Sequence, residues 1–199
     1  MKILHPRQIV VAIEGIDGAG KSTLINLLNE EFRNTIGIYS RTEKGSLLDF
    51  LVSRKIMQNH HGLQVPIYLF LSFKNYVTLG KYRNRPVILM DRCFLSNFCY
   101  FYFESLFTAK EFKKKMRFEI KLMPQKIFII DADPLVAYHR DKKKKHIDWL
   151  ITTRKHYLQA ISSPLMGKYH IEIISNDLTI EEKKERIADY IRREINYGH

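Results

Sequence analysis

The sequence predicts an α/β fold of three layers, in which helices flank a five-stranded parallel sheet. Three apolar runs of strand length cover residues 9–14, 86–91 and 126–131, and segments with helical periodicity lie between them. Continuous apolar runs are typical of strands that are buried on both faces, as in a parallel sheet. The alternation of such strands with helices favours a doubly wound arrangement. Ligands in folds of this kind bind beyond the carboxyl ends of the strands.

The elements can be assigned in order along the chain. After the first strand, apolar residues recur at three- and four-residue steps from Lys21, which predicts a helix. Strands at residues 37–40 and 170–174 complete the sheet. Thr179 is the expected N-cap of the last helix, with Glu182 at the capping-box spacing. After the helix that begins at Lys21, the predicted helices cover residues 47–52, 64–83, 94–105, 109–121, a segment from about 134, 148–162 and, as the last helix, 179–195.

The composition fits one domain over residues 1–199, because 45% of the residues are hydrophobic and can form a substantial core. The net charge of +12 suits polyanionic partners such as nucleotides, but the basic residues are scattered and show no aromatic-basic RNA-binding motif. Nucleic acid is therefore not the expected partner. Cys93 and Cys99 have neither the context of a disulfide framework nor the spacing of a zinc site. No apolar run approaches the length of a membrane span, and we expect a cytoplasmic protein without a membrane partner.

The strongest motif follows the first strand. Gly15-x-x-x-x-Gly20-Lys21-Ser22 fits the P-loop pattern between a strand and a helix, which is the context that confirms it. In such a loop the backbone N–H groups and the helix N-terminus bind phosphates, the lysine reaches the β- and γ-phosphates, and the serine hydroxyl binds Mg²⁺. The sequence therefore predicts a P-loop fold that binds ATP and Mg²⁺. The expected nucleotide-binding residues are Gly15, Asp17, Gly18, Ala19, Gly20, Lys21, Ser22 and Thr23.

A P-loop kinase of small phosphorylated substrates needs three further features. An acid near the Mg²⁺ is available in Asp91, at the end of a predicted strand; Arg92 beside it and Arg41 after the second strand are candidate clamps for the acceptor phosphate. A basic segment over residues 140–148 could form a short lid, in which Arg140 is a candidate catalytic cation. Each feature also has a plain interpretation: a strand-end salt bridge, a solvated surface arginine and a solvated lysine run. The chain lacks the Asn-Lys-x-Asp motif of a GTPase.

Taken together, these motifs resemble those of thymidylate kinases, which transfer the γ-phosphate of ATP to dTMP. The resemblance spans nearly the whole chain in the right order, and the first and fourth of its segments are specific. The segments are residues 14–23 (EGIDGAGKST), 41–43 (RTE), 69–74 (LFLSFK), 91–100 (DRCFLSNFCY), 124–140 and 154–157. The resemblance implies a nucleoside monophosphate kinase that uses ATP and Mg²⁺, with Ser22 and Asp91 as the residues that would bind the metal. It also implies a homodimer, the usual state in this family.

The resemblance also implies roles for the acceptor-binding residues. Phe70 would stack on the base, Arg41 and Arg92 would bind the acceptor phosphate, and Tyr100 would help to exclude a ribose 2′-hydroxyl. Asp17 would accept a hydrogen bond from the sugar 3′-hydroxyl. Core packing remains an alternative for Phe70 and for Tyr100. The full set at these positions is Asp17, Arg41, Phe70, Lys74, Arg92, Ser96 and Tyr100.

The residue after the P-loop acid divides the family into two kinds. Some members place an arginine there as the transition-state cation, whereas others have a glycine and supply the cation from the lid. This chain has Gly18 after Asp17, so it resembles the second kind, and Arg140 with the lysines that follow it becomes the expected source.

Departures from the family pattern fall on the acceptor side and the lid. Lys74 stands where an arginine contacts the base, Cys93 replaces an aromatic residue or histidine, and Lys44 replaces a proline. Phosphoryl transfer from ATP is therefore better supported than thymine as the base. Two alternatives stay open. One is a kinase of another nucleotide or of a deoxynucleoside, for which Glu14 could act as base by its position; the other is an inactive nucleotide-binding regulator.

Overall fold

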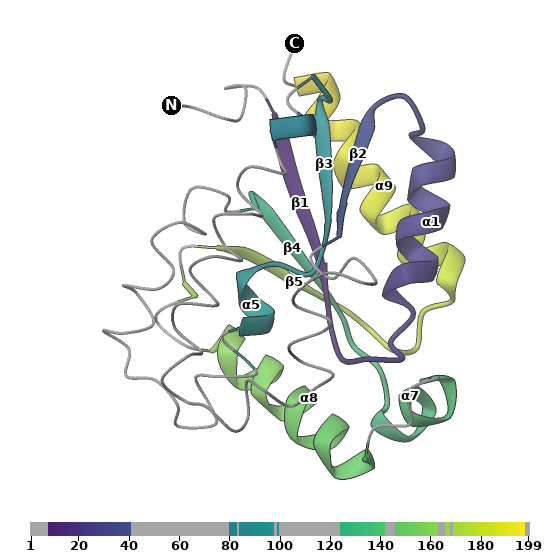
Figure 1. Cartoon of the computed structure of the whole chain (residues 1–199), viewed down its shortest axis with the longest axis vertical. Helices are drawn as coiled ribbons and strands as arrows, with labels where there is room; N and C mark the ends of the chain where they lie inside the picture. Colours follow the sequence, from purple (N-terminus) through teal and green to yellow (C-terminus); the bar gives the residue numbers. More distant parts are fainter. Residues whose placement is uncertain are drawn as a thin grey trace.

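The computed structural model describes residues 8–40, 80–82, 84–97, 99, 124–141, 146–162, 166–167 and 169–197. At its centre lies a five-stranded sheet in the order β2-β3-β1-β4-β5 (Figure 1), and each neighbouring pair is parallel. The predicted α/β fold with a five-stranded parallel sheet is thus confirmed. The strands are β1 (Ile9–Glu14), β2 (Ile36–Ser40), β3 (Val87–Asp91), β4 (Lys126–Ile130) and β5 (His170–Ile174).

The three central strands are apolar because they are covered on both faces. Val10 to Ile13 of β1 and Val87 to Met90 of β3 are buried, as are the last four residues of β4. In the register of β1 and β3, Ile13 is opposite Asp91. The residues that follow β1 and β3 therefore emerge side by side at the carboxyl edge of the sheet, where ligands of parallel sheets bind.

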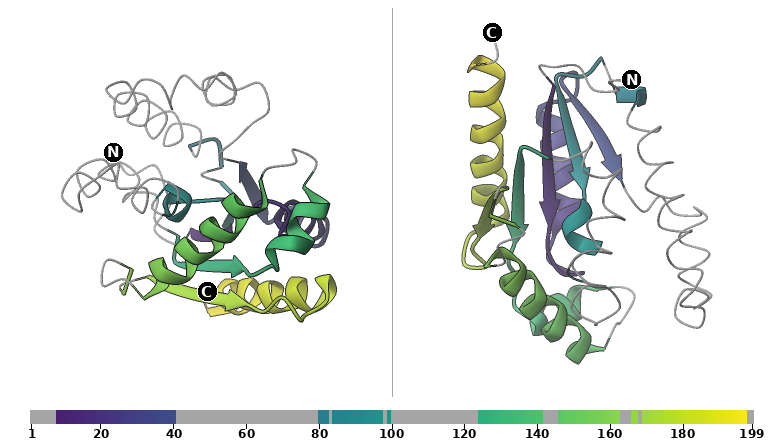
Figure 2. Two further views of the ribbon diagram at one scale, coloured as in Figure 1. Left: turned by 90° about the horizontal axis from the view of Figure 1, so that it is seen from below. Right: turned by 90° about the vertical axis from the view of Figure 1, so that its left-hand side faces the viewer.

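Helices cover both faces of the sheet, as Figure 2 shows. On one face α1 (Lys21–Glu31) and α9 (Ile180–Tyr197) pack against each other and are joined by an ion pair of 2.7 Å between Glu31 and Lys184. α5 (Phe94–Asn97) and α8 (Ile147–Ile161) lie on the opposite face. The remaining described helices are α7 (Pro134–Arg140) and the short 3₁₀ helix η1 (Gly80–Tyr82).

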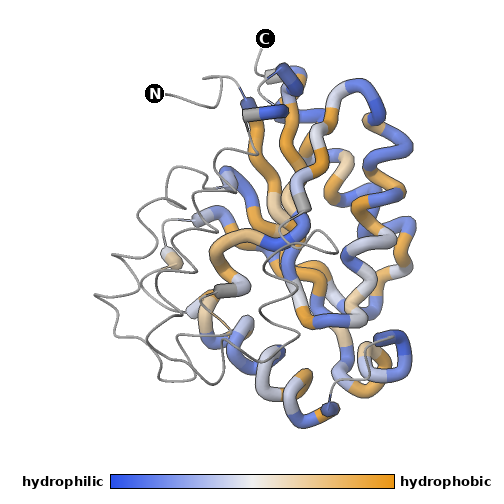
Figure 3. The backbone as a smooth tube through the Cα atoms, viewed as in Figure 1, coloured by the Kyte–Doolittle hydropathy of each residue, from blue (hydrophilic) through white to orange (hydrophobic). Residues whose placement is uncertain are grey.

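The hydropathy of the chain follows these layers. In Figure 3 the central strands are mainly hydrophobic, whereas hydrophilic and hydrophobic residues alternate along α1 and α9. This alternation gives each outer helix one face for the sheet and one for solvent. Among the residues that the structure describes, no helix is both long enough and apolar enough to cross a bilayer.

Local capping signals set where two helices begin. The expected capping box of the last helix is confirmed: the Thr179 backbone N–H donates to Glu182 (2.7 Å) and the Glu182 N–H donates to Thr179 Oγ1 (3.2 Å). At α7, Asp133 accepts hydrogen bonds from the N–H groups of Leu135 (2.8 Å) and Val136 (3.1 Å). Pro134 follows at the first helical position, where its missing N–H is not needed.

Several predicted elements lie wholly or mostly outside the described residues. They are the helices over residues 47–52, 64–83 and 109–121, and most of the helix over residues 94–105. The segment over residues 140–148, predicted as a lid, overlaps two helices, because Arg140 ends α7 and Ile147 begins α8. Between these helices, residues 142–145 are outside the described part of the chain.

Candidate active site

The loop between β1 and α1 has the conformation that its glycines allow. Gly15, Gly18 and Gly20 have φ angles of 136°, 81° and 87°, a region that residues with a Cβ rarely adopt. Space is also limiting: a Cβ on Gly15 would lie 2.5 Å from the Ile130 carbonyl oxygen, and one on Gly18 would lie 2.1 Å from the Ala137 carbonyl oxygen. The loop therefore packs directly on the end of β4 and on α7.

Lys21 is buried beneath this loop, with 6% of its surface exposed. Its Nζ donates to the carbonyl oxygens of Gly15 (3.0 Å) and Ile16 (2.6 Å). Burial, with a smaller contribution from the nearby Arg92 guanidinium, lowers the pKa of Lys21 to about 7. An ammonium group held in so dry a place is poised for an anionic ligand, whose charge would offset the cost of burial.

The start of α1 offers the donors and the hydroxyl that a nucleotide phosphate and Mg²⁺ require. Gly20 stands at the N-cap and has no side-chain oxygen to offer the first amides of the helix, while Ser22 and Thr23 are exposed in its first turn. Asp91 ends the neighbouring strand, and burial raises the pKa of its carboxyl group; a cation bound at that point would offset the cost of burying the charged form.

No group of three or more His, Cys, Asp or Glu residues suited to a metal occurs within the described residues. Mg²⁺ does not need one, because it usually binds through one or two carboxylates, water and substrate phosphates. Ser22 and Asp91 fit that donor set.

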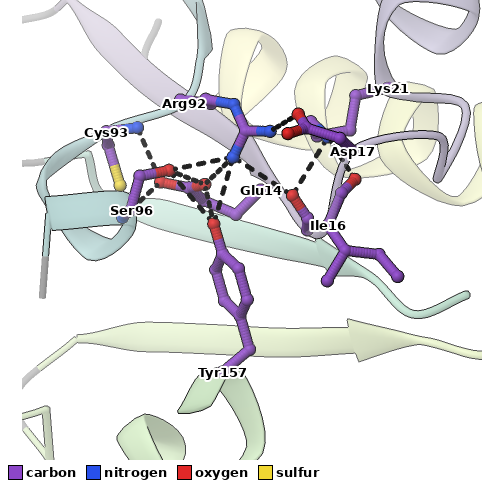
Figure 4. Close-up of polar contacts among 9 residues, drawn as sticks. Glu14, Ile16, Asp17, Lys21, Arg92, Cys93, Ser96 and Tyr157 are labelled. Carbon is purple, nitrogen blue, oxygen red and sulfur yellow. Dashed lines mark hydrogen bonds and ion pairs between the residues drawn. The ribbon is translucent and has the colours of Figure 1, made fainter. Parts of the chain in front are cut away.

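Arg92 stands directly after β3 and is drawn into the site by contacts from several segments (Figure 4). Its backbone has a φ of 69°, in the left-handed region, and its N–H donates to Ile13 (3.1 Å). One terminal nitrogen, Nη2, pairs with Asp17 Oδ1 at 2.5 Å, and the other, Nη1, donates to the Gly15 carbonyl oxygen at 3.2 Å. The P-loop acid and the strand-end arginine therefore form one ion pair.

Glu14, the last residue of β1, is fully buried and accepts four hydrogen bonds. Its Oε1 binds the N–H groups of Cys93 (2.7 Å) and Ser96 (3.1 Å). Its Oε2 binds the hydroxyl groups of Ser96 (2.7 Å) and Tyr157 (2.9 Å). This carboxylate fixes the turn that carries Arg92, because both N–H donors belong to the residues that follow Arg92.

Only part of this network can be predicted from the sequence. The sequence marks Glu14 as the first residue of the 14–23 segment and as a candidate base in the alternative reaction with a deoxynucleoside, and it marks Tyr157 only as part of the 154–157 segment. An acid at the end of a buried strand is a detectable signal, since a buried carboxylate must be paired or hydrogen-bonded. Its partners Ser96 and Tyr157 lie 82 and 143 residues away, so spacing could not identify them.

Of the predicted site residues, the structure brings three from the end of β3 and just after it together with two from the P-loop. Asp17, Lys21, Asp91 and Arg92 influence one another electrostatically, and Ser96 joins through its hydrogen bond from Arg92 Nη1 at 3.2 Å. Ser96 is buried and its hydroxyl binds Glu14, so it is placed behind Arg92. Four predicted acceptor-binding residues lie outside the described part of the chain: Arg41, Phe70, Lys74 and Tyr100.

The helices beside residues 142–145 also contact the site. Arg154 of α8 forms a two-pronged pair with Asp131 after β4, at 2.7 and 2.8 Å. Arg140, exposed at the end of α7, is close enough to Lys183 of α9 to lower its pKa, after the larger effect of burial. Cys93 and Cys99 are both buried and form no disulfide with each other.

Comparisons with known proteins agree with this geometry. A family model described as Thymidylate kinase matches residues 13–187. Thymidylate kinase of Campylobacter jejuni (strain 81-176) is 25% identical over 197 residues, covering 92% of this chain and 97% of its own. The probable thymidylate kinase 1 of Saccharolobus solfataricus is 25% identical over 198 residues, covering 94% and 99%.

Two solved structures share the fold. Deoxyadenosine kinase from M. mycoides has a TM-score of 0.65 at 15% identity, with 93% of this chain and 100% of that chain covered. Thymidylate kinase from Ehrlichia chaffeensis has a TM-score of 0.64 at 18% identity, with 94% and 100% covered. At these identities the two structures establish only the fold, and the family model establishes the family. Because that model spans most of the sequence, including the P-loop and the Asp91-Arg92 pair, the chain belongs to the thymidylate kinase family of nucleoside monophosphate kinases.

Proposed function

We propose that this protein transfers the γ-phosphate of ATP to a deoxynucleoside monophosphate, and that dTMP is its principal acceptor. The observation that carries the proposal is the ion pair between Asp17 and Arg92. It joins the loop that would bind the donor phosphates to the arginine that would bind the acceptor phosphate. The two substrates would therefore meet at one point, as in-line transfer requires.

On the donor side, the loop amides and Lys21 would bind the β- and γ-phosphates of ATP. Ser22 and Asp91 would hold Mg²⁺, which supplies charge neutralisation between the phosphates. The buried position of Lys21 supports this role, because a cation excluded from water acts more strongly on charge that develops during transfer.

On the acceptor side, Arg92 would hold the phosphate whose oxygen attacks the γ-phosphorus of ATP as ADP departs. The acceptor phosphate is ionised near neutral pH, so no strong base is needed. Asp17 would orient both Arg92 and the 3′-hydroxyl of the sugar. We further assign base stacking to Phe70, a contact to the base to Lys74, phosphate binding to Arg41, and 2′-hydroxyl exclusion to Tyr100. Ser96 would support Arg92.

The transition-state cation would come from the lid. Gly18 lies against the Ala137 carbonyl oxygen, at a point where even a Cβ has no room, so an arginine does not fit there as the loop and α7 are placed in this protein. Arg140 ends the helix that makes this contact. We therefore assign the catalytic cation to Arg140 or to one of the lysines at 142–145. The whole chain would act as one cytoplasmic kinase domain, as a homodimer.

A deoxynucleoside kinase would need a carboxylate free to accept the proton of a sugar hydroxyl. Glu14 is the candidate by position, yet each of its oxygens already accepts two hydrogen bonds and the group is fully buried. This saturation argues against Glu14 as a base and supports a monophosphate as the acceptor.

The experiment that tests the proposal measures ADP release with ATP, Mg²⁺ and a panel of nucleosides and nucleoside monophosphates. We expect turnover with dTMP to exceed turnover with every other acceptor. Preference for another monophosphate would show that the acceptor base is not thymine, and would leave the proposed monophosphate kinase reaction in place. Turnover restricted to nucleosides, or ATP binding without turnover, would overturn the proposal in favour of a deoxynucleoside kinase or an inactive regulator.

A further inference from the structure

Tyr157 extends from α8 into the polar cluster behind Arg92, although α8 follows the basic segment rather than the P-loop (Figure 4). Its hydroxyl donates to Glu14 Oε2 at 2.9 Å and lies 3.0 Å from Ser96 Oγ. It also accepts a hydrogen bond from Arg92 Nη1 at 3.3 Å. Only 2% of the Tyr157 surface is exposed, so the residue acts from within the protein and not by direct contact with a substrate.

The two hydroxyl groups fill the space between Glu14 and Arg92. Glu14 Oε2 and Arg92 Nη1 are 4.0 Å apart, which is too long for a hydrogen bond. Ser96 and Tyr157 each bind both groups, so they connect the buried carboxylate to the guanidinium. In so dry a site each bridge is strong, and the loss of one leaves charged groups incompletely paired.

The helix that carries Tyr157 is itself anchored near the site. Arg154, one turn earlier, pairs with Asp131 at the end of β4. His156 Nδ1 lies 2.9 Å from the Cys99 carbonyl oxygen. Because Arg154 and His156 are both bound to other segments, the part of α8 that carries Tyr157 is held in place. The position of the Tyr157 hydroxyl is therefore well defined.

We propose that Tyr157 is a positioning residue for the acceptor clamp, and that together with Glu14 and Ser96 it aims the guanidinium of Arg92 at the acceptor phosphate. This role rests on the proposed function, since it assumes that Arg92 binds that phosphate. It predicts that the two substrates are affected differently. Loss of the Tyr157 hydroxyl should impair the use of the monophosphate and leave the binding of ATP unchanged, because Tyr157 binds Arg92 and Glu14, whereas Lys21 is held by the carbonyl oxygens of Gly15 and Ile16.

The test compares Tyr157→Phe with Thr153→Val, a control on the same helix. Thr153 is also buried, at 3% exposure, but its hydroxyl donates to the Trp149 carbonyl oxygen within α8. Each variant thus removes one buried hydroxyl, and only one of the two touches the clamp. Steady-state kinetics with the preferred monophosphate and with ATP give both KM values, and thermal unfolding gives the stability of each variant.

We expect Tyr157→Phe to raise the KM for the monophosphate about tenfold, the factor for loss of one hydrogen bond to a charged group. The KM for ATP should change by less than about twofold, and Thr153→Val should alter neither KM by more than this. If Tyr157→Phe does not fold, Ser96→Ala removes the other bridging hydroxyl and should give the same selective loss.

An unchanged monophosphate KM in Tyr157→Phe, or equal losses for both substrates, would overturn the positioning role while leaving the proposed function intact. Wild-type protein that turns over no monophosphate would instead overturn the proposed function, and this role with it. The two failures are therefore distinguishable in one set of assays.

Discussion

At the scale of single residues, the burial of Lys21 suits the proposed binding of an anion but lowers the stability of the ligand-free protein. Its burial lowers its pKa to about 7, whereas in the unfolded chain the group keeps its ordinary value near 10.5. Between these values the unfolded state binds more protons, so stability rises as pH increases through this window, and below about pH 7 the full cost of burying the charge remains.

We therefore predict that Lys21→Met stabilises the ligand-free protein at about pH 7, with a Tm increase of about 3 °C or more. The increase should shrink toward about pH 9, where wild-type Lys21 is largely neutral. Thermal unfolding of both proteins at the two pH values measures it. Equal Tm differences at both would contradict the assignment, because the remaining titrating groups are shared by the two proteins.

Arg92, directly after β3, offers a prediction with a control residue that lies before the same strand. Arg92→Ala should lower kcat/KM for the monophosphate by about a hundredfold or more, because a charged clamp with several hydrogen bonds is lost. Arg85, at the opposite end of β3, is exposed and donates to the Asn34 carbonyl oxygen. Arg85→Ala should leave kcat/KM nearly unchanged. A loss below about threefold in Arg92→Ala would rule out the clamp.

Asp17 is the acid inside the P-loop, and its side chain is directed at Arg92. Asp17→Ala should therefore reduce kcat/KM for the acceptor by about tenfold or more while the Kd for ATP changes by less than about threefold. Equilibrium binding of ATP and steady-state kinetics give the two values. Comparable losses on both sides would mean that Asp17 shapes the loop as a whole.

At the scale of elements, the contact between the P-loop and α7 sets the choice of glycine at position 18. Gly18→Ala would add both left-handed strain and a clash with the Ala137 backbone, and should cost about 2–5 kcal/mol of unfolding free energy. Gly20→Ala adds the same kind of strain, but its nearest neighbour is the Ile180 Cδ1 atom at 3.9 Å. It should cost only about 1–2 kcal/mol.

Urea unfolding of the two variants checks this prediction, with the slope of the transition as a test that both unfold in the same manner. Equal costs would show that backbone strain alone requires the glycines. A larger cost for Gly18→Ala would show that α7 is seated on the loop, so that the loop and the helix before residues 142–145 are packed as one unit.

At the scale of the whole molecule, the parallel sheet brings the ends of β1, β3 and β4 to one edge. The P-loop follows β1, Arg92 follows β3, and Asp131, which binds Arg154 of α8, follows β4. A ligand bound at this edge touches segments that are far apart in the sequence, and its binding should therefore stabilise the entire fold.

Accordingly, ATP with Mg²⁺ at about 100 times its Kd should add about 2.7 kcal/mol to the unfolding free energy and raise the Tm by roughly 5–10 °C. Thermal unfolding over a range of ATP concentrations measures the shift. Lys21→Met should abolish most of it. A wild-type Tm that does not respond to ATP would contradict the donor site.

The sequence by itself determined the strands and the phosphate-binding loop. A strand buried on both faces has to be apolar along its whole length, so β1, β3 and β4 were visible as uninterrupted runs, and their predicted bounds agree with the structure to within one residue. The P-loop motif and the Thr179 capping box are equally local signals, because Lys21 binds the carbonyl oxygens of Gly15 and Ile16 and Thr179 binds Glu182.

Only the tertiary structure decided how Arg92 is held and why position 18 is glycine. The contacts of Arg92 with Asp17 and Tyr157 span 75 and 65 residues, and the bond of Tyr157 to Glu14 spans 143. No local pattern encodes such pairs. They arise because the parallel sheet collects the carboxyl ends of its strands at one edge and α8 crosses beside it, where buried charges must find partners.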